Sequence, residues 1–186
     1  MKKFGTVLLC SATLFAAGDF SNRRAPSWAL PDSNLVHYDL LDYRGKVVVL
    51  DFMAAQCVHC VEVAPLMDEL KAKFGDRVAV FSIVTYPPDT QQTVGNFQAT
   101  TKTKVPILFD CGQVTRNYLK ITAQSSQRDL PHVFIIDQAG IIKNDFAYGP
   151  DNKAIFAGKG LLKEVEKLLG GAPSSGALPR PPSGRK

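Results

Sequence analysis

The chain has 186 residues, of which 45% are apolar and 21% charged, and its formal net charge is +5. A chain of this length and composition can bury enough apolar surface for one well-packed domain, which excludes collagen-like and wholly disordered proteins. The terminal residues Lys2, Lys3, Arg180, Arg185 and Lys186 account for the whole net charge, so the sequence indicates no nucleic-acid-binding face.

In chain order, the first predicted element is an export signal at residues 1–18. Two lysines precede a mostly apolar stretch from Phe4 to Ala17, and small residues then offer a cleavage site before Asp19. The stretch is shorter than the roughly 20 residues of a membrane span, so a cleaved leader is favoured over an anchor. We therefore expect a periplasmic or otherwise extracytoplasmic protein, which could associate with a membrane only through an uncleaved leader. Residues 19–26 are predicted to be a linker.

Residues 27–110 alternate between strand and helix patterns. Turn residues mixed with short apolar runs at 27–45 indicate a loop with an edge strand or hairpin. The Val-rich run KVVVLDFMA, from Lys46, is typical of a strand that is covered on both faces. Helical spacing of apolar residues then extends to Phe74, with a kink expected at Pro65. The elements expected next are a strand at 78–85, a polar helix at 89–102 capped by Asp89 or Thr90, and a short strand at 107–110.

The rest of the chain predicts a short helix from Gln113, a polar loop, and a hairpin whose first strand is opened by Pro131. Residues 153–169 predict one closing helix, and the Pro/Gly/Ser-rich residues 170–186 a disordered tail. A strand–helix–strand start gives parallel pairing, whereas a hairpin adds antiparallel strands. The predicted fold class is therefore α/β, a mixed central sheet with helices on both faces.

Cys57 and Cys60 are separated by two residues, at the point where the first buried strand is followed by a helix. They could be a redox pair, half of a metal site, or two small buried residues. Residues three apart are neighbours on a helix, and the first turn of a helix stabilises a thiolate. The redox interpretation is therefore favoured, with Cys57 as the nucleophile because it lies nearer the helix start and solvent.

Two nearby side chains are expected to assist the cysteines. His59 lies between them and, when protonated, would stabilise the Cys57 thiolate and make the disulfide more oxidising; otherwise it simply faces solvent. Asp51 interrupts the apolar strand, where burial should raise its pKa. A carboxyl of that kind suits proton transfer from Cys60, unless Asp51 lies on an edge strand and faces water.

The alternative sites have weaker support in the sequence. A closed zinc site needs about four ligands, and beyond the close pair only His59, His132 and Cys111 remain to complete one. A purely structural disulfide across so short a loop would constrain little chain. Cys111 could be a resolving thiol or a site of mixed disulfides, but a small, buried and inert residue is favoured because free cysteines are commonly buried. No metal and no cofactor are expected.

The segment YRGKVVVLDFMAAQCVHCVEVAPLMDEL resembles the thioredoxin superfamily, in particular its exported TlpA/ResA-like reductases, and so does LPHVFIIDQAGII. The resemblance covers about residues 25–169, and the thioredoxin-like domain is predicted at residues 27–169. It implies that Pro131 is a cis-proline packed against the cysteine pair, that the backbone of Leu130 binds an extended substrate segment, and that Asp51 is the buried acid. A peroxiredoxin is disfavoured, because its active-site pattern would need proline in place of Leu50 and a hydroxyl residue in place of Ala54.

These features predict an extracytoplasmic thiol–disulfide oxidoreductase with Cys57, Cys60 and Asp51 as its catalytic residues. Its expected substrates are protein thiols and disulfides, served by a redox partner protein that the sequence does not identify. Reduction of exported proteins such as apocytochromes, for cytochrome c maturation, is the leading role that the resemblance implies. CVHC also resembles the turn of oxidising, DsbA-like members, so a disulfide donor is one alternative. A thioredoxin-fold metal-delivery or binding protein without turnover is the other.

Overall fold

The computed structural model describes residues 18–125 and 129–170. Its main feature is a six-stranded sheet in the order β1-β8-β7-β4-β5-β6. Strands β4, β5 and β6 are parallel, whereas β7 pairs antiparallel with β4, β8 with β7, and β1 with β8. The mixed sheet is confirmed. Its strands are β1 (Arg23–Arg24), β4 (Val47–Phe52), β5 (Val78–Thr85), β6 (Ile107–Asp110), β7 (His132–Ile136) and β8 (Ile141–Ala147).

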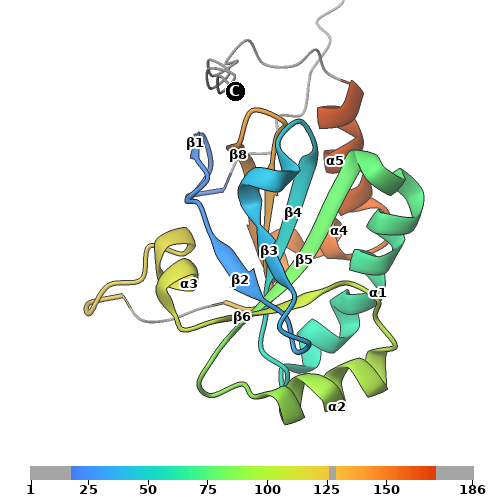
Figure 1. The fold of residues 1–186 in the computed structure, drawn as a ribbon. Coiled ribbons are helices and arrows are strands. Elements are labelled where there is room, and N and C mark those ends of the chain that lie inside the picture. The colour runs from blue at the N-terminus through green and yellow to red at the C-terminus, as the bar shows by residue number, and fades with distance from the viewer. Residues whose placement is uncertain (1–17, 126–128, 171–186) are drawn as a thin grey trace, which may run out of the picture.

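Helices and a hairpin cover the two faces of this sheet (Figure 1). Helices α1 (Val58–Phe74) and α5 (Gly160–Gly170) pack on one face, with the short α4 (Lys153–Phe156), and α2 (Gln91–Thr101) lies beside α1. The other face carries α3 (Gln113–Tyr118) and the predicted hairpin of β2 (Ala29–Pro31) and β3 (His37–Asp39). Three 3-10 turns complete the structure: η1 (Leu40–Tyr43), η2 (Gly75–Arg77) and η3 (Pro150–Asn152).

Strand β4 lies in the middle of the sheet, and all six of its residues are buried. Because successive side chains of a strand point to opposite faces, Val48 and Leu50 join the core under the hairpin and α3. Val47 and Val49 join the core under α1 and α5. Asp51 lies on the same side of the strand as Val47 and Val49, so its carboxyl points toward the α1 face.

The expected closing helix at 153–169 was wrong, because the structure breaks it into α4 and α5. Ala157 is extended, with φ −87° and ψ 128°, and Gly158 has a positive φ of 64°. Such a φ suits glycine and interrupts a helix. The predicted apolar side of the second part is confirmed, since Leu161, Leu162 and Val165 are buried.

The two ends of the chain differ from expectation in one respect. Residues 19–26, expected to be a linker, contain β1, which adds an edge strand to the sheet through Arg23 and Arg24. The predicted leader lies outside the described residues except for Gly18, and the predicted tail except for Gly170. Within residues 18–125 and 129–170, no helix combines the length and apolar character needed to cross a membrane.

Candidate functional site

Cys57 occupies the N-cap of α1, just after the turn that follows β4. Its backbone is extended, and its sulfur accepts a hydrogen bond from the backbone N–H of Cys60 at 3.2 Å. The first N–H groups of a helix have no partner within the helix and carry the positive end of its dipole. The Cys57 sulfur thus lies where a negative charge is stabilised, as the position of the pair in the sequence predicted.

The two thiols differ in exposure. Cys57 is half-buried, Cys60 is fully buried, and the neighbouring Val58 is 70% exposed. Burial, the nearby charge of Asp51 and a hydrogen bond with Cys57 raise the pKa of the Cys60 thiol. Cys57 is therefore the sulfur that a partner can reach, whereas Cys60 keeps its proton until a base removes it.

Asp51 is the buried acid of the site, with a side chain only 1% exposed. Ser82 donates a hydrogen bond to its Oδ2 at 3.4 Å, but among the described residues Oδ1 has no hydrogen-bond partner. Burial raises the pKa of Asp51 to about 7, and the Ser82 hydrogen bond only partly offsets this. The carboxyl lies close enough to Cys60 for its charge to affect that thiol. Such a group can exchange a proton near neutral pH.

Leu130 and Pro131 lie opposite Cys57. Their peptide bond is cis, as the resemblance implied, and the Cys57 thiol donates to the carbonyl oxygen of Leu130 at 3.8 Å. The backbone N–H of Tyr148 holds the same loop through the carbonyl oxygen of Pro131 at 2.9 Å. The structure thus brings Cys57 into contact with Cys60 and Leu130, while Asp51 lies within range of Cys60.

His59 has partners that the sequence did not identify. Its Nδ1 lies 3.0 Å from Oε2 of Glu62, and its ring stacks on Tyr148 with centroids 4.3 Å apart. The hydroxyl of Tyr148 donates to the same Oε2 at 3.2 Å. Glu62 stands three residues after His59 on a helix, a spacing that could have suggested the contact. Tyr148 is 86 residues from Glu62 and further from His59, so the sequence held no such signal for it.

Asp89 is a further residue of the site that the sequence suggested only as a helix cap. It is buried, and its Oδ1 accepts hydrogen bonds from the backbone N–H of Ala55 at 3.1 Å and from Thr93 Oγ1 at 3.2 Å. The cap of α2 is instead Thr90, which forms a capping box with Thr93. Asp89 therefore joins the turn before Cys57 to the first turn of α2.

His132 follows Pro131 and was one of the residues that could have completed a zinc site. In the structure it pairs with Asp145 instead. It is buried, and its Nε2 lies 3.0 Å from Oδ2 of Asp145, whose other oxygen binds Phe20 N–H at 3.0 Å and Ser21 Oγ at 2.6 Å. Although burial opposes it, the hydrogen bonds from His132 and Ser21 lower the pKa of Asp145. In the described part of the chain, no three His, Cys, Asp or Glu side chains are grouped so as to hold a metal ion.

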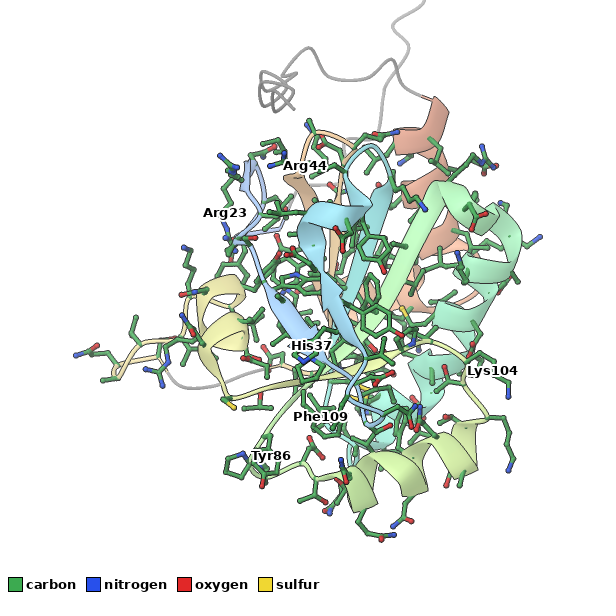
Figure 2. The ribbon with its side chains drawn as sticks, viewed as in Figure 1. Arg23, His37, Arg44, Tyr86, Lys104 and Phe109 are labelled. Carbon is green, nitrogen blue, oxygen red and sulfur yellow. The ribbon has the colours of Figure 1, made fainter. Side chains whose placement is uncertain are left out.

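The expectation that Cys111 is buried was wrong, because its side chain is exposed at the end of β6. It lines a cavity of about 1020 Å³ between the β2–β3 hairpin, the loop after β5, and α3. Tyr86 and Phe109 line this cavity as well (Figure 2). Neither Cys57 nor Cys60 lines it. A smaller cavity of about 100 Å³, with Ala54, Asp89 and Leu130 in its wall, adjoins the cysteine turn.

Comparison with known proteins places this geometry among thioredoxin-like proteins. A model of the AhpC/TSA family matches residues 21–145. The chain is 27% identical over 148 residues to the thioredoxin-like protein YneN of Bacillus subtilis, covering 79% of this chain and 77% of that protein. It is 29% identical over 143 residues to the thiol-disulfide oxidoreductase ResA of Bacillus cereus, covering 72% and 79%. A crystal structure assigned as the thiol:disulfide interchange protein DsbE of Chlorobium tepidum has a TM-score of 0.64 and 25% identity, covering 81% and 98%.

Proposed function

Because the chain belongs to the AhpC/TSA family of thioredoxin-like proteins and is a thiol–disulfide oxidoreductase, we propose that it reduces protein disulfides outside the cytoplasm with Cys57 and Cys60. One observation carries the proposal. The half-buried sulfur of Cys57 caps α1 and faces the Leu130 carbonyl beside Cys60, and the buried Cys60 thiol lies within range of the charge of the buried Asp51. One accessible nucleophile, one protected thiol and one buried base are what a dithiol reductant needs.

In the first step, the Cys57 thiolate attacks one sulfur of a substrate disulfide. A bond forms between Cys57 and that sulfur, the substrate S–S bond breaks, and the other substrate sulfur leaves as a thiolate that takes a proton from water. The N–H of Cys60 and the helix dipole stabilise the attacking charge. The backbone of Leu130 and Pro131 is proposed to hold the substrate segment beside Cys57.

In the second step, Asp51 accepts the proton of Cys60, and the resulting thiolate attacks the Cys57 sulfur. The mixed disulfide breaks, the second substrate sulfur leaves as a thiolate, and Cys57 and Cys60 become a disulfide. The substrate disulfide has then gained two electrons from the protein's dithiol. A partner protein that carries a dithiol must return two electrons before the next cycle.

The location and the client proteins are also part of the proposal. A lysine pair, an apolar stretch and small residues at 1–18 have the pattern of an export signal. The relatives include a thiol-disulfide oxidoreductase named ResA and a thiol:disulfide interchange protein named DsbE, whose names support a redox role on protein thiols. For clients we propose exported proteins with paired thiols, apocytochromes among them, as the resemblance to TlpA/ResA-like reductases implies.

The contacts of His59 favour reduction over disulfide donation. A His59 charge that is available to the Cys57 thiolate would stabilise the reduced form and make the couple more oxidising. In the described part of the chain, the imidazole instead forms its ion-pair contact with Glu62. A carboxylate at 3.0 Å neutralises that charge, so the reduced form gains less stability from it.

Trapping of mixed disulfides tests the proposed cycle. We expect Cys60→Ser to retain a nucleophilic Cys57 but to lose the resolving thiol, so that client proteins accumulate as covalent adducts. The adducts are measured on non-reducing gels after expression with the leader intact, and dithiothreitol should release them. Cys111→Ser is the matched control and should form no adducts. Adducts that persist in a Cys57→Ser/Cys60→Ser double variant would contradict the assignment, because they would have to form through Cys111.

A further inference from the structure

The side chains around His59 form a small cluster that the two-step cycle does not use. His59, Glu62 and Tyr148 come from the first two turns of α1 and from the residue that follows β8. One oxygen of Glu62, Oε2, faces both the imidazole at 3.0 Å and the Tyr148 hydroxyl at 3.2 Å. The two rings stack nearly parallel, with 19° between their planes. Each of the three side chains therefore contacts the other two.

Tyr148 connects this cluster to the reacting sulfur. Its backbone N–H binds the carbonyl oxygen of Pro131, whose neighbour Leu130 contacts the Cys57 thiol. Partial desolvation, the Glu62 hydrogen bond and charge, and the charge of Cys57 together raise the pKa of Tyr148. The tyrosine is thus close enough to respond to the Cys57 charge while its ring lies against His59. Charges on the cluster lie within electrostatic range of the thiolate.

We propose that Glu62 and Tyr148 are positioning residues that keep the Cys57/Cys60 couple reducing, by holding the imidazole of His59 against a carboxylate. A protonated imidazole by itself would stabilise the Cys57 thiolate, the reduced form of the couple. Paired with Glu62, it presents a dipole with no net charge, and the field of a dipole falls off faster than that of a single charge. This inference rests on the proposed function, because it concerns the potential of the same cysteine pair.

The hydrogen bond from His59 dominates the environment of Glu62. That bond, with a second from Tyr148, lowers the pKa of Glu62, which favours the ionised carboxylate. All three groups are partly exposed, with side-chain exposures of 53% for His59 and 56% for Glu62. Salt should therefore weaken any effect they have on the thiolate, because the Debye length falls from about 10 Å at 0.1 M to about 3 Å at 1 M.

A double-mutant cycle on His59 and Glu62 tests the inference. In a Cys111→Ser background, the pH profile of Cys57 alkylation by iodoacetamide reports thiolate formation, and equilibration with dithiothreitol reports the potential. We expect Glu62→Gln to shift the profile to lower pH by roughly half a unit, the size expected of one exposed charge several ångströms away. The couple should become about threefold more oxidising, or about 15 mV at about 30 mV per tenfold.

The cycle also separates an effect through His59 from a direct one. The shift caused by Glu62→Gln should be larger in a His59→Ala background, where Glu62 is an uncompensated negative charge, and both shifts should shrink at 1 M salt. Tyr148→Phe keeps the stacked ring, loses the donor to Glu62, and should give a smaller shift than Glu62→Gln. Glu69→Gln, which removes an exposed charge two turns further along α1, should leave both readouts unchanged.

Two results would overturn the inference: a Glu62→Gln variant with the wild-type profile and potential, or the same shift with and without His59. The second result would mean that Glu62 repels the thiolate directly. A wild-type potential in the range of strong oxidants would contradict the proposed reducing function instead. The same mutant cycle would still measure the coupling between His59 and Glu62. Failure of the inference and failure of the proposed reducing function can therefore be told apart.

Discussion

Cys57→Ser is expected to reduce the disulfide-reductase activity of the protein to the uncatalysed rate. Cys57 is the accessible sulfur of the pair, and it caps the helix that stabilises its charge. A serine hydroxyl can accept the same hydrogen bond from Cys60 N–H, so the fold and the turn should survive. It is not ionised near neutral pH, however, and cannot form the mixed disulfide. The measurement is reduction of insulin disulfides with dithiothreitol as the electron source.

Cys111→Ser provides the matched control for this loss. Cys111 is an exposed thiol that lines a cavity without Cys57 or Cys60 in its wall. Its removal should therefore leave the rate of insulin reduction unchanged. Activity that survived Cys57→Ser but disappeared with Cys111→Ser would transfer the nucleophile to Cys111, which follows β6, and would refute the assignment.

Asp51→Asn is expected to make the protein more stable above neutral pH. Burial raises the pKa of Asp51 from 3.8 to about 7, so between these values the folded protein holds a proton that the unfolded chain has lost. The free energy of unfolding therefore falls as pH rises from about 4 to about 7, by roughly 4 kcal/mol at 1.36 kcal/mol per unit. Asparagine keeps the size of the side chain and its bond with Ser82 but cannot ionise.

Urea unfolding at pH 5 and pH 8 measures this effect. We expect Asp51→Asn and the wild type to differ little at pH 5, where Asp51 is protonated in the folded protein. At pH 8 the variant should be more stable by a few kcal/mol, since it avoids an ionised buried carboxylate. Asp151→Asn, at an exposed carboxyl in η3, is the control and should track the wild type at both pH values. Equal pH slopes for Asp51→Asn and the wild type would contradict a raised pKa.

The same substitution should slow the second step of the cycle. A base with a pKa near 7 acts when it is ionised, so resolution of the mixed disulfide by Cys60 should accelerate as pH rises through 7. In Asp51→Asn this rise should disappear, and mixed disulfides should persist. A variant that gains stability at pH 8 and loses this pH dependence would tie both effects to one buried carboxyl.

The parts of the fold that could be predicted from the sequence are those whose signal is local. The apolar run at β4 and the helical spacing of α1 predicted both elements and placed Cys57 at the start of the helix. The single charge within the run marked Asp51, because an ionisable residue among buried neighbours is conspicuous in a sequence. Each of these signals depends on residues only a few positions apart.

The features that were missed depend on contacts between distant segments. Tyr148 reaches His59 and Glu62 only because β8 returns beside β7 and the Pro131 loop. The pairing of Arg23 and Arg24 with β8 is likewise invisible in a polar segment that follows a predicted leader. Cys111 was expected to be buried because cysteines commonly are, but its exposure depends on how the β2–β3 hairpin meets β6. The break between α4 and α5 did have a local signal in Gly158 and Gly160, which the apolar pattern outweighed.

The reduction potential of the Cys57/Cys60 couple tests the reducing function most directly. It is measured by equilibrating the protein with defined ratios of reduced and oxidised dithiothreitol and counting free thiols in the Cys111→Ser background. The proposed reducing function predicts a value near that of thioredoxin, about −270 mV. A value near that of strong oxidants, about −120 mV, would contradict the account and make the protein a disulfide donor.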